Sequence, residues 1–232
     1  MKDIVVVIPA YEPSETLIRL VRALRSNFRH IVVVDDGSAP SCAVFPALRD
    51  IGGITLLRHE TNRGKGAALK TAFAHVLAHI PEAVGVVTAD ADGQHVLEDI
   101  RKVAAEASRH PDRLTLGVRS FSGDIPFRSR FGNIWTRIEF RLLTGVSVQD
   151  TQTGLRGIPA SWLPDLLAIE GDRYEYEIRM LVYGSRAKRK PAGIPISTVY
   201  LDGNSASHFR PFKDTLRTQT ALISAAFSRR SP

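Results

Sequence analysis

The chain has 232 residues but a single cysteine, Cys42, and it lacks any apolar run of the roughly 18 residues that a membrane-spanning helix needs. One cysteine cannot form an internal disulfide, and such low cysteine use fits a reducing compartment. The first residues do not have the pattern of a secretory signal peptide, because their apolar run, Ile4–Ile8, ends at Pro9. These absences predict a cytoplasmic protein that is soluble or peripheral to a membrane.

Acidic residues are outnumbered, so the formal net charge is +7 and the sequence pI about 9.8. Such an excess suits a phosphorylated substrate, an anionic lipid surface or simply a solvated basic face. No zinc-finger spacing and no basic, aromatic-rich strand is present, so nucleic acid is not predicted as a partner. The excess falls into two groups, which are Arg186, Lys188, Arg189 and Lys190, then Arg210, Lys213, Arg217, Arg229 and Arg230.

Strand-like and helix-like segments alternate through the first half of the chain. A continuous apolar run of β-branched residues predicts a strand at Ile4–Ile8, and further strands are predicted at Ile31–Val34, Ile54–Leu57, Val84–Thr88 and Leu114–Val118. Apolar residues at helical spacing predict helices at Leu17–Leu24, Val44–Asp50, Lys65–Ala78 and Leu97–Ser108. This alternation predicts an α/β fold with a mainly parallel central sheet flanked by helices.

After about residue 120 the rhythm changes, although no linker separates the two parts. Helices are predicted at Ser129–Leu143, Ala160–Leu167, Tyr174–Tyr183 and Pro211–Phe227, with a turn-like stretch at Asp150–Gly157, a loop at Phe121–Phe127 and a strand at Ile194–Val199. We expect one domain over residues 1–210, in halves 1–120 and 121–210, followed by a basic helix in 211–232. That helix, with its apolar face Phe212, Leu216, Ile223 and Phe227, either lies on an anionic membrane or packs on the domain.

Asp90 and Asp92 stand one residue apart directly after a predicted strand. As the chain turns at Gly93, both carboxylates can converge on one point, and two like charges held together need a cation. Hard oxygen ligands suit Mg²⁺ or Mn²⁺, and Gln94 offers a further oxygen. A solvated turn is the alternative.

Two further polar segments follow predicted strands. Asp35 and Asp36, before Gly37-Ser38, can accept hydrogen bonds from a nucleobase or a ribose, or form an ordinary capped turn. The segment Asn62–Ala68 opens a helix with small residues and two cations, as a phosphate cradle or a glycine-rich helix start would. It matches neither the P-loop nor the Gly-x-Gly-x-x-Gly pattern.

The order Pro-Ala-Tyr, Asp-Asp-Gly-Ser, Asn-Arg-Gly-Lys-Gly and Asp-Ala-Asp-Gly-Gln-His strongly resembles the inverting glycosyltransferases of family 2, which have the GT-A nucleotide-diphospho-sugar transferase fold. Within that family the chain is most similar to the dolichyl- and polyprenyl-phosphate sugar synthases, over roughly residues 3–210. The resemblance implies that the metal ligands are Asp90, Asp92 and Gln94. It also implies a nucleotide pocket lined by Pro9, Tyr11, Glu12, Asp35 or Asp36, and Lys65.

The second half extends the resemblance. Gly117-Val118-Arg119 resembles the family's Gly-Ser-Arg, and Arg128 and Arg130 fall in the stretch that meets phosphates there, although a helix-start surface charge is the alternative. Asp150-Thr-Gln-Thr-Gly resembles the family's Asp-x-x-Ser-Gly. If the acceptor is a sugar hydroxyl, a carboxylate should act as base, and the candidates are Asp150, Glu175 and Glu177.

His208 comes late, in a polar loop, where it either closes over the donor diphosphate or is an exposed bystander. His95 is interpreted as a helix-start residue or a support for the metal ligands.

Three functions are compatible with this sequence. The leading one is metal-dependent transfer of a hexose from a UDP- or GDP-linked donor to polyprenyl or dolichyl phosphate at the cytoplasmic membrane face. The metal and the arginines would stabilise the departing diphosphate, and an anionic lipid phosphate would need no strong base. The second is a soluble family 2 enzyme with a saccharide or other small-molecule acceptor, and the third a nucleotide-sugar-binding module without turnover. The sequence determines neither the sugar nor the oligomeric state.

Overall fold

A single mixed sheet organises the protein. The computed structural model describes residues 3–119, 127–186, 190–197 and 211–227, with backbone alone for 127–134 and 211–216. In this described part the sheet has seven strands in the order β3-β2-β1-β4-β6-β5-β7. The strands are β1 (Ile4–Ala10), β2 (His30–Asp35), β3 (Thr55–Arg58), β4 (Gly85–Thr88), β5 (Thr115–Arg119), β6 (Arg156–Pro159) and β7 (Ala192–Ile196). Only β6 runs antiparallel to its neighbours, so the prediction of a mainly parallel sheet is confirmed.

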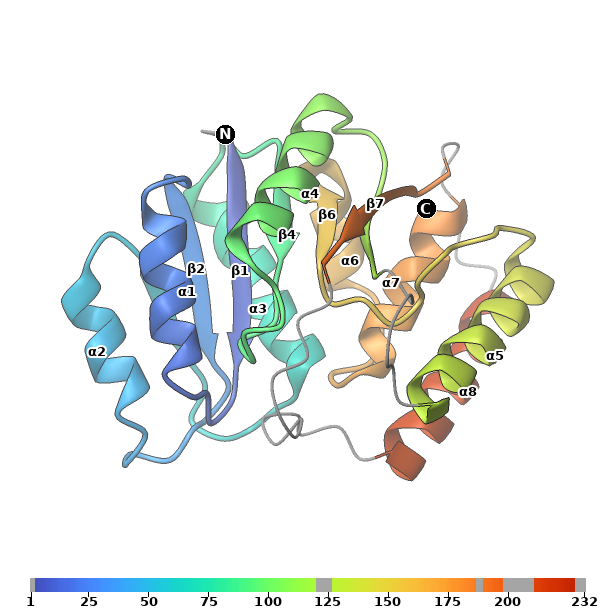
Figure 1. Ribbon diagram of the computed structural model, residues 1–232, viewed down its shortest axis with the longest axis horizontal. Helices are drawn as coiled ribbons and strands as arrows, with labels where there is room; N and C mark the ends of the chain where they lie inside the picture. The colour runs from blue at the N-terminus through green and yellow to red at the C-terminus, as the bar shows by residue number, and fades with distance from the viewer. Residues whose placement is uncertain (1–2, 120–126, 187–189, 198–210, 228–232) are drawn as a thin grey trace.

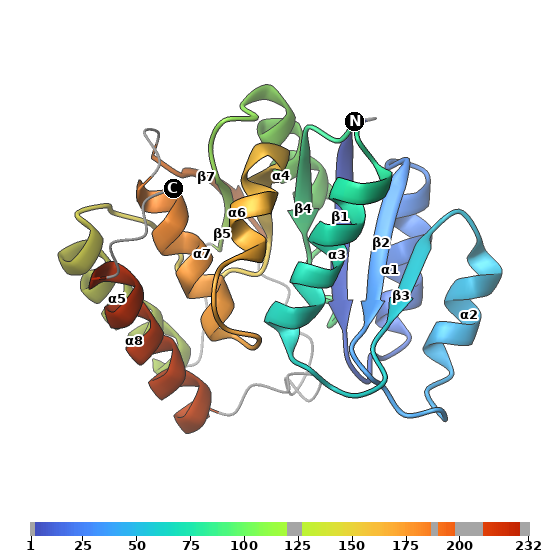
Figure 2. The same ribbon diagram turned by 180° about the vertical axis from the view of Figure 1, so that it is seen from behind.

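Helices cover both faces of the sheet (Figures 1 and 2). On one face lie α1 (Thr16–Arg25), α2 (Val44–Ile51) and α4 (Leu97–Arg109). On the other lie α3 (Lys65–His79), α6 (Leu163–Leu167), α7 (Glu175–Arg186) and α8 (Pro211–Phe227), with α5 (Phe127–Thr144) beside α8. Buried side chains of β1 alternate between the two cores, Ile4 and Val6 toward α1 and Val5 and Val7 toward α3. This alternation follows from the two-residue period of a strand.

The strands predicted in the first half are confirmed, with bounds that move by one or two residues. All seven residues of β1 are buried, as a central parallel strand with helices on both faces requires. The helices predicted there are confirmed to the same degree, and α5, α7 and α8 are confirmed in the second half. β7 confirms the beginning of the strand expected at Ile194–Val199, whose last two residues lie outside the described ones.

The strand β6 is the element that the sequence did not predict. It lies within the stretch expected to be a turn followed by a helix. Its four residues include Gly157 and Pro159, which carry little strand propensity. A Cβ on Gly157 would lie 2.7 Å from the Cβ of Ala107, so glycine here allows α4 to pack closely on the sheet. The helix expected at Ala160–Leu167 is divided into a 3₁₀ turn and α6, which has Pro164 in its first turn.

The C-terminal helix α8 packs through Ala221, Leu222 and Ala225, which join the same core as α7. Of the apolar face expected from the sequence, Ile223 and Phe227 are exposed, and the other two side chains lie outside the described ones. The division into residues 1–210 and 211–232 stays a prediction. No helix in the described residues is long and apolar enough to cross a bilayer.

Candidate active site

The candidate site lies at the edge of the sheet where the parallel strands end. β4 stops at Thr88, and the loop that follows carries Asp90 and Asp92 before turning at Gly93, whose φ is +83°. The Thr88 hydroxyl donates to the carbonyl oxygen of Gly154 at 2.7 Å, which joins this loop to the segment before β6. The end of β4 and the segment before β6 therefore lie together at the site, although they are more than sixty residues apart in the sequence. They meet because β6 is inserted between β4 and β5.

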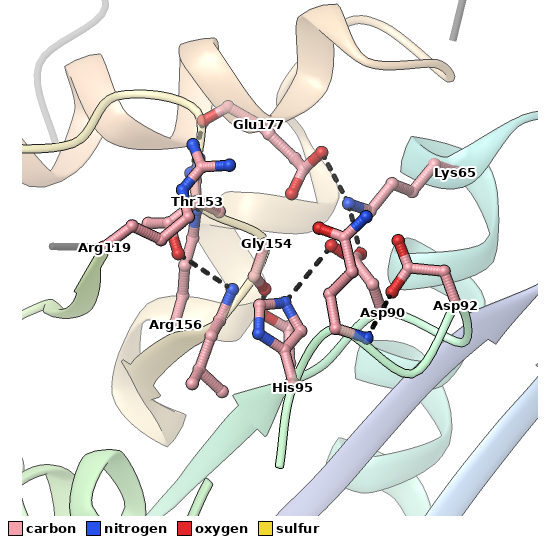
Figure 3. A network of polar contacts seen from close by, with 12 residues as sticks. Lys65, Asp90, Asp92, His95, Arg119, Thr153, Gly154, Arg156 and Glu177 are labelled. Carbon is pink, nitrogen blue, oxygen red and sulfur yellow. Dashed lines mark hydrogen bonds and ion pairs between the residues drawn. The ribbon is translucent and has the colours of Figure 1, made fainter. Parts of the chain in front are cut away.

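Asp90 lies at the centre of a network of charged side chains (Figure 3). Its Oδ1 is 2.6 Å from Lys65 Nζ and its Oδ2 is 3.3 Å from His95 Nε2. The same ammonium is 2.9 Å from Glu177 Oε2, on the first turn of α7. Burial by itself would lower the pKa of Lys65, but the charges of Asp90 and Glu177 outweigh it and hold that pKa above its ordinary value.

The two carboxylates respond in opposite ways to the same surroundings. Burial would raise the pKa of Asp90, but Lys65 and His95 outweigh it and hold that pKa well below its usual range. Burial and then the negative charge of Asp90 raise the pKa of Asp92, whose Oδ1 accepts a hydrogen bond from the Gln94 backbone N–H at 2.9 Å. The negative charge of Asp90 is thus balanced by nearby cations, whereas a negative charge on Asp92 is disfavoured by burial and by the charge of Asp90.

This donor set fits a divalent cation that prefers oxygen. In the described residues no three His, Cys, Asp or Glu side chains gather into a metal cage. Mg²⁺ and Mn²⁺ do not require one, because they are commonly held by one or two carboxylates and complete their shells with water and substrate phosphates. Asp90, Asp92 and Gln94 are the residues that would hold such an ion, and its charge would offset the cost at Asp92.

A pocket opens beside Asp90. It is lined by Asp90, Gln94, His95, Arg119, Gln152, Thr153, Gly154, Ile196 and Ser197. One carboxylate, that of Asp90, and one guanidinium, that of Arg119, therefore line the same pocket. Such a pocket can hold a cation and an anion next to each other, as a metal-bound diphosphate requires.

Arg119 and Asp150 form a two-pronged ion pair. Arg119 Nε donates to Asp150 Oδ2 at 2.7 Å and Nη2 donates to Oδ1 at 3.0 Å, while Gln152 N–H also donates to Oδ1. The Asp150 side chain is fully buried. Both oxygens of Asp150 are occupied by these donors, so the geometry favours Asp150 as the residue that orients Arg119.

Arg156 is a residue that the sequence did not single out. It is buried, and its guanidinium donates to three backbone carbonyls, those of Thr151, Thr153 and Glu177. Burial lowers its pKa, against the opposing charges of Glu177 and Asp150. Arg156 therefore ties the segment that touches Asp90 to the helix turn that carries Glu177. The feature of the sequence that could have identified Arg156 is its position two residues after the Asp150-Thr-Gln-Thr-Gly segment.

The loops after β1 and β2 form the predicted nucleotide side of the site. Glu12, at φ +46°, donates its backbone N–H to Ser38 Oγ at 2.9 Å and accepts from the Ala39 N–H through Oε1 at 2.6 Å. Pro9 pairs with Val34 inside the sheet, and Tyr11 is partly exposed next to it. The structure therefore brings these two loops together, and their contact with a nucleotide stays a prediction.

Asp35 and Asp36 have different surroundings. Asp35 accepts from the Ser38 N–H at 2.8 Å and lies 3.5 Å from Arg58 Nε. Asp36 accepts from the backbone N–H groups of Arg63 and Gly64 and contacts His59 Nδ1 at 2.7 Å. Asp36 thus holds the loop that leads into α3, Asp35 holds the turn at Ser38, and a nucleotide contact by either stays a prediction.

Of the predicted site residues, Glu175 is engaged away from the pocket, and three others have side chains outside those that the structure describes. Glu175 Oε1 accepts from the backbone N–H groups of Asp172 and Arg173, both at 3.3 Å, so this side chain caps the start of α7 while Glu177 faces the site. Arg128 and Arg130 lie on the first turns of α5, where the backbone alone is described. His208 lies outside the described residues.

The fold is one that known nucleotide-sugar enzymes have. A crystal structure of glucosyl-3-phosphoglycerate synthase from Mycobacterium tuberculosis, with Mn²⁺, UDP and glucosyl-3-phosphoglycerate, superposes with a TM-score of 0.71. The match covers 99% of this chain and 82% of that one, at 16% identity. The protein therefore has the GT-A fold.

Sequence comparison identifies the family. The family model described as "Glycosyl transferase family 2" matches residues 5–165, which is more than half of the chain. The protein belongs to this family and is a glycosyltransferase, as the motifs predicted.

Two curated relatives are named for polyprenyl-phosphate acceptors. UDP-N-acetylglucosamine--dolichyl-phosphate N-acetylglucosaminyltransferase of Methanococcus voltae is 28% identical over 88% of this chain and 89% of its own length. Undecaprenyl-phosphate 4-deoxy-4-formamido-L-arabinose transferase of Enterobacter sp. (strain 638) is 31% identical over 65% of this chain and 47% of its own length. The resemblance to the polyprenyl-phosphate branch of the family is confirmed.

Proposed function

We propose that the protein transfers a hexose, or its N-acetylated form, from a UDP- or GDP-linked donor to a polyprenyl phosphate, with inversion and with Mg²⁺ or Mn²⁺. The observation that carries this proposal is the pocket that Asp90 and Gln94 line together with Arg119. Asp90 and Gln94 would hold the metal ion, and Arg119 would hold phosphate oxygens.

In this reaction the bond between the anomeric carbon and the donor phosphate oxygen breaks, and a bond to an acceptor phosphate oxygen forms. The nucleoside diphosphate leaves with the electron pair. A bound divalent cation supplies charge stabilisation to that leaving group. Arg119, fixed by Asp150, offers a planar guanidinium to phosphate oxygens. An acceptor phosphate is already an anion, so no side chain needs to remove a proton.

Exposed apolar side chains support a lipid acceptor. Of the described residues, the large hydrophobic side chains with the greatest exposure lie on α5 and α8: Trp135, Ile138, Leu142, Ile223 and Phe227. Leu142 is 79% exposed and Phe227 is 75% exposed. The two helices lie side by side, and their first turns lie at the end of the molecule toward which the arrows of β1 and β2 point (Figures 1 and 2).

This arrangement fits a peripheral contact with the cytoplasmic face of an anionic membrane. Exposed Arg141 and Arg217 accompany the apolar side chains on the same two helices. Amphipathic helices with tryptophan, phenylalanine and leucine on one side and basic residues beside them bind such surfaces. A contact of this kind would hold the protein on the membrane through α5 and the second half of α8, where the described exposed side chains lie.

A second acceptor class has an observation in its favour. The solved structure with the GT-A fold described above contains glucosyl-3-phosphoglycerate, a small anionic product. A small phosphorylated or saccharide acceptor is therefore the alternative, and it would use the same donor side. The third function considered from the sequence, a nucleotide-sugar-binding module without turnover, is not favoured, because the chain belongs to a glycosyltransferase family and Asp90, Asp92 and Gln94 are all present.

A transfer screen tests the proposal. UDP- and GDP-linked hexoses and N-acetylhexosamines are incubated with Mg²⁺ or Mn²⁺ and with a short polyprenyl phosphate, 3-phosphoglycerate or no acceptor, and the products are analysed by mass spectrometry. We expect transfer to the lipid that is lost in EDTA and in Asp92→Asn. Transfer to 3-phosphoglycerate alone would establish the second acceptor class, and nucleotide binding without turnover would establish the binding module.

A further inference from the structure

Lys65 lies between two carboxylates that belong to different parts of the fold. Its ammonium is 2.6 Å from Asp90 Oδ1 and 2.9 Å from Glu177 Oε2 (Figure 3). The three side chains are 18%, 28% and 13% exposed, so water screens these contacts only in part. One cation here neutralises two anions at once.

The backbone that presents Lys65 is firmly placed. Lys65 is the first residue of α3, and the N–H of the preceding Gly64 donates to Asp36 Oδ2 at 2.8 Å. Gly64 has φ +107°, and a Cβ there would lie 2.4 Å from the carbonyl oxygen of Asp172. Movement of the ammonium therefore comes from the four-carbon side chain, which can turn from one carboxylate to the other while its backbone stays in place.

A divalent cation at Asp90 and the Lys65 ammonium need the same carboxylate. Two positive charges bound to one half-buried carboxylate repel each other, because water screens them only in part. We propose that Lys65 is the counter-ion of Asp90 in the metal-free protein, that it competes with the divalent cation for this carboxylate, and that Glu177 retains the ammonium once it is displaced. The inference rests on the metal dependence proposed above.

This arrangement has two consequences for the protein. Without metal, Lys65 holds Asp90 in its ionised and positioned form, so that the loop between β4 and α4 keeps its place. With metal, the ammonium moves to Glu177 at the border of the pocket. Glu177 therefore favours metal binding indirectly, by offering Lys65 a second partner.

The test measures Mn²⁺ affinity by isothermal titration calorimetry and by electron paramagnetic resonance of free Mn²⁺, on the full chain without donor. Competition predicts that Lys65→Met binds Mn²⁺ roughly ten-fold more tightly than the wild type, because the competing ion pair is gone. It predicts that Glu177→Gln binds Mn²⁺ several-fold more weakly, because the ammonium then has Asp90 alone. The matched control is Lys70→Met, which removes the same charge from the same helix at a residue paired with Asp172, and we expect less than a two-fold change.

A double-mutant cycle separates competition from a general effect of charge. If Glu177 acts through Lys65, then Glu177→Gln has little effect on Mn²⁺ affinity in the Lys65→Met background. Additive effects in the cycle, or equal affinities of the wild type and Lys65→Met, would overturn the proposal while leaving the metal site intact. If Lys65→Met does not fold, Lys65→Gln takes its place in the same cycle, and unchanged Mn²⁺ binding by Glu177→Gln refutes the competition.

The same experiment distinguishes a failure of the underlying function. If Mn²⁺ binds neither the wild type nor Lys65→Met, and transfer proceeds in EDTA, then the metal dependence itself is wrong. If Mn²⁺ binds the wild type and Asp92→Asn abolishes that binding, then the metal site is sound, and the affinities of the two single variants decide the role of Lys65 alone.

Discussion

Glycine at position 154 is predicted to be indispensable for the geometry of Asp90. A Cβ at this position would lie 2.2 Å from Asp90 Oδ2 and 2.7 Å from Asp90 Cγ. An ordinary contact between carbon and oxygen needs at least about 3.3 Å, so Gly154→Ala requires a displacement of about 1 Å. Asp90 cannot move without disturbing its ion pair with Lys65, and the loop cannot move without disturbing the bond from Thr88.

The magnitude follows from that displacement. Misplacing a reacting group by 1 Å costs on the order of 100-fold in rate, which corresponds to about 2.7 kcal/mol of transition-state stabilisation. Overpacking of this kind lowers the free energy of unfolding by roughly 1–3 kcal/mol. We therefore expect Gly154→Ala to lose about two orders of magnitude in kcat/KM for transfer and to bind Mn²⁺ more weakly, with a moderate fall in Tm.

The matched control is Gly157→Ala, three residues further along the chain. Its Cβ would meet the Cβ of Ala107 at 2.7 Å, inside the core rather than at Asp90. This variant should lose stability to a similar degree and retain the Mn²⁺ affinity of the wild type. If Gly154→Ala binds Mn²⁺ and transfers sugar as the wild type does, then the segment before β6 yields easily and the reasoning is wrong.

Three further predictions use the same assays. Arg119→Lys should lower kcat/KM roughly 10- to 100-fold with little change in Tm, because a lysine cannot form the paired hydrogen bonds to Asp150; unchanged kinetics would remove this arginine from the phosphate site. Asp36→Asn should lower the free energy of unfolding by roughly 1.5–3 kcal/mol in calorimetry, because it weakens the bonds that begin α3; a loss of donor affinity without a loss of stability would instead show a direct nucleotide contact. Leu142→Ser should reduce sedimentation with anionic vesicles several-fold, whereas Leu77→Ser, a partly exposed leucine on α3, should not; equal sedimentation of both would argue against α5 as the membrane contact.

The strands and helices of the first half could be predicted from the sequence because their cause is local. Ile4–Ala10 of β1 and Ile31–Val34 of β2 are apolar without interruption, and only a strand covered on both faces buries such a run completely. The polar residues that follow each strand must then gather at one edge of the sheet. The meeting of Lys65, Asp90 and Arg119 at that edge is therefore implied by a mainly parallel topology.

The second half was less predictable, because its decisive features are contacts between distant segments. β6 has weak strand propensity and forms because β4 and β5 lie open on either side of it. Its insertion brings Gly154 against Asp90, and no pattern within residues 150–159 indicates that contact.

Residue types and their spacing were sufficient to establish the α/β class, the acidic pair and the family. Contacts made on folding were needed to choose between neighbouring candidates. Glu175 and Glu177 lie about 200° apart around a helix, so packing alone selects which one faces Lys65. Asp35 and Asp36 project to opposite sides of the chain, and the surrounding donors give Asp36 to the start of α3. In both pairs the sequence offers two equivalent carboxylates, and the partner supplied by a distant segment assigns each its role.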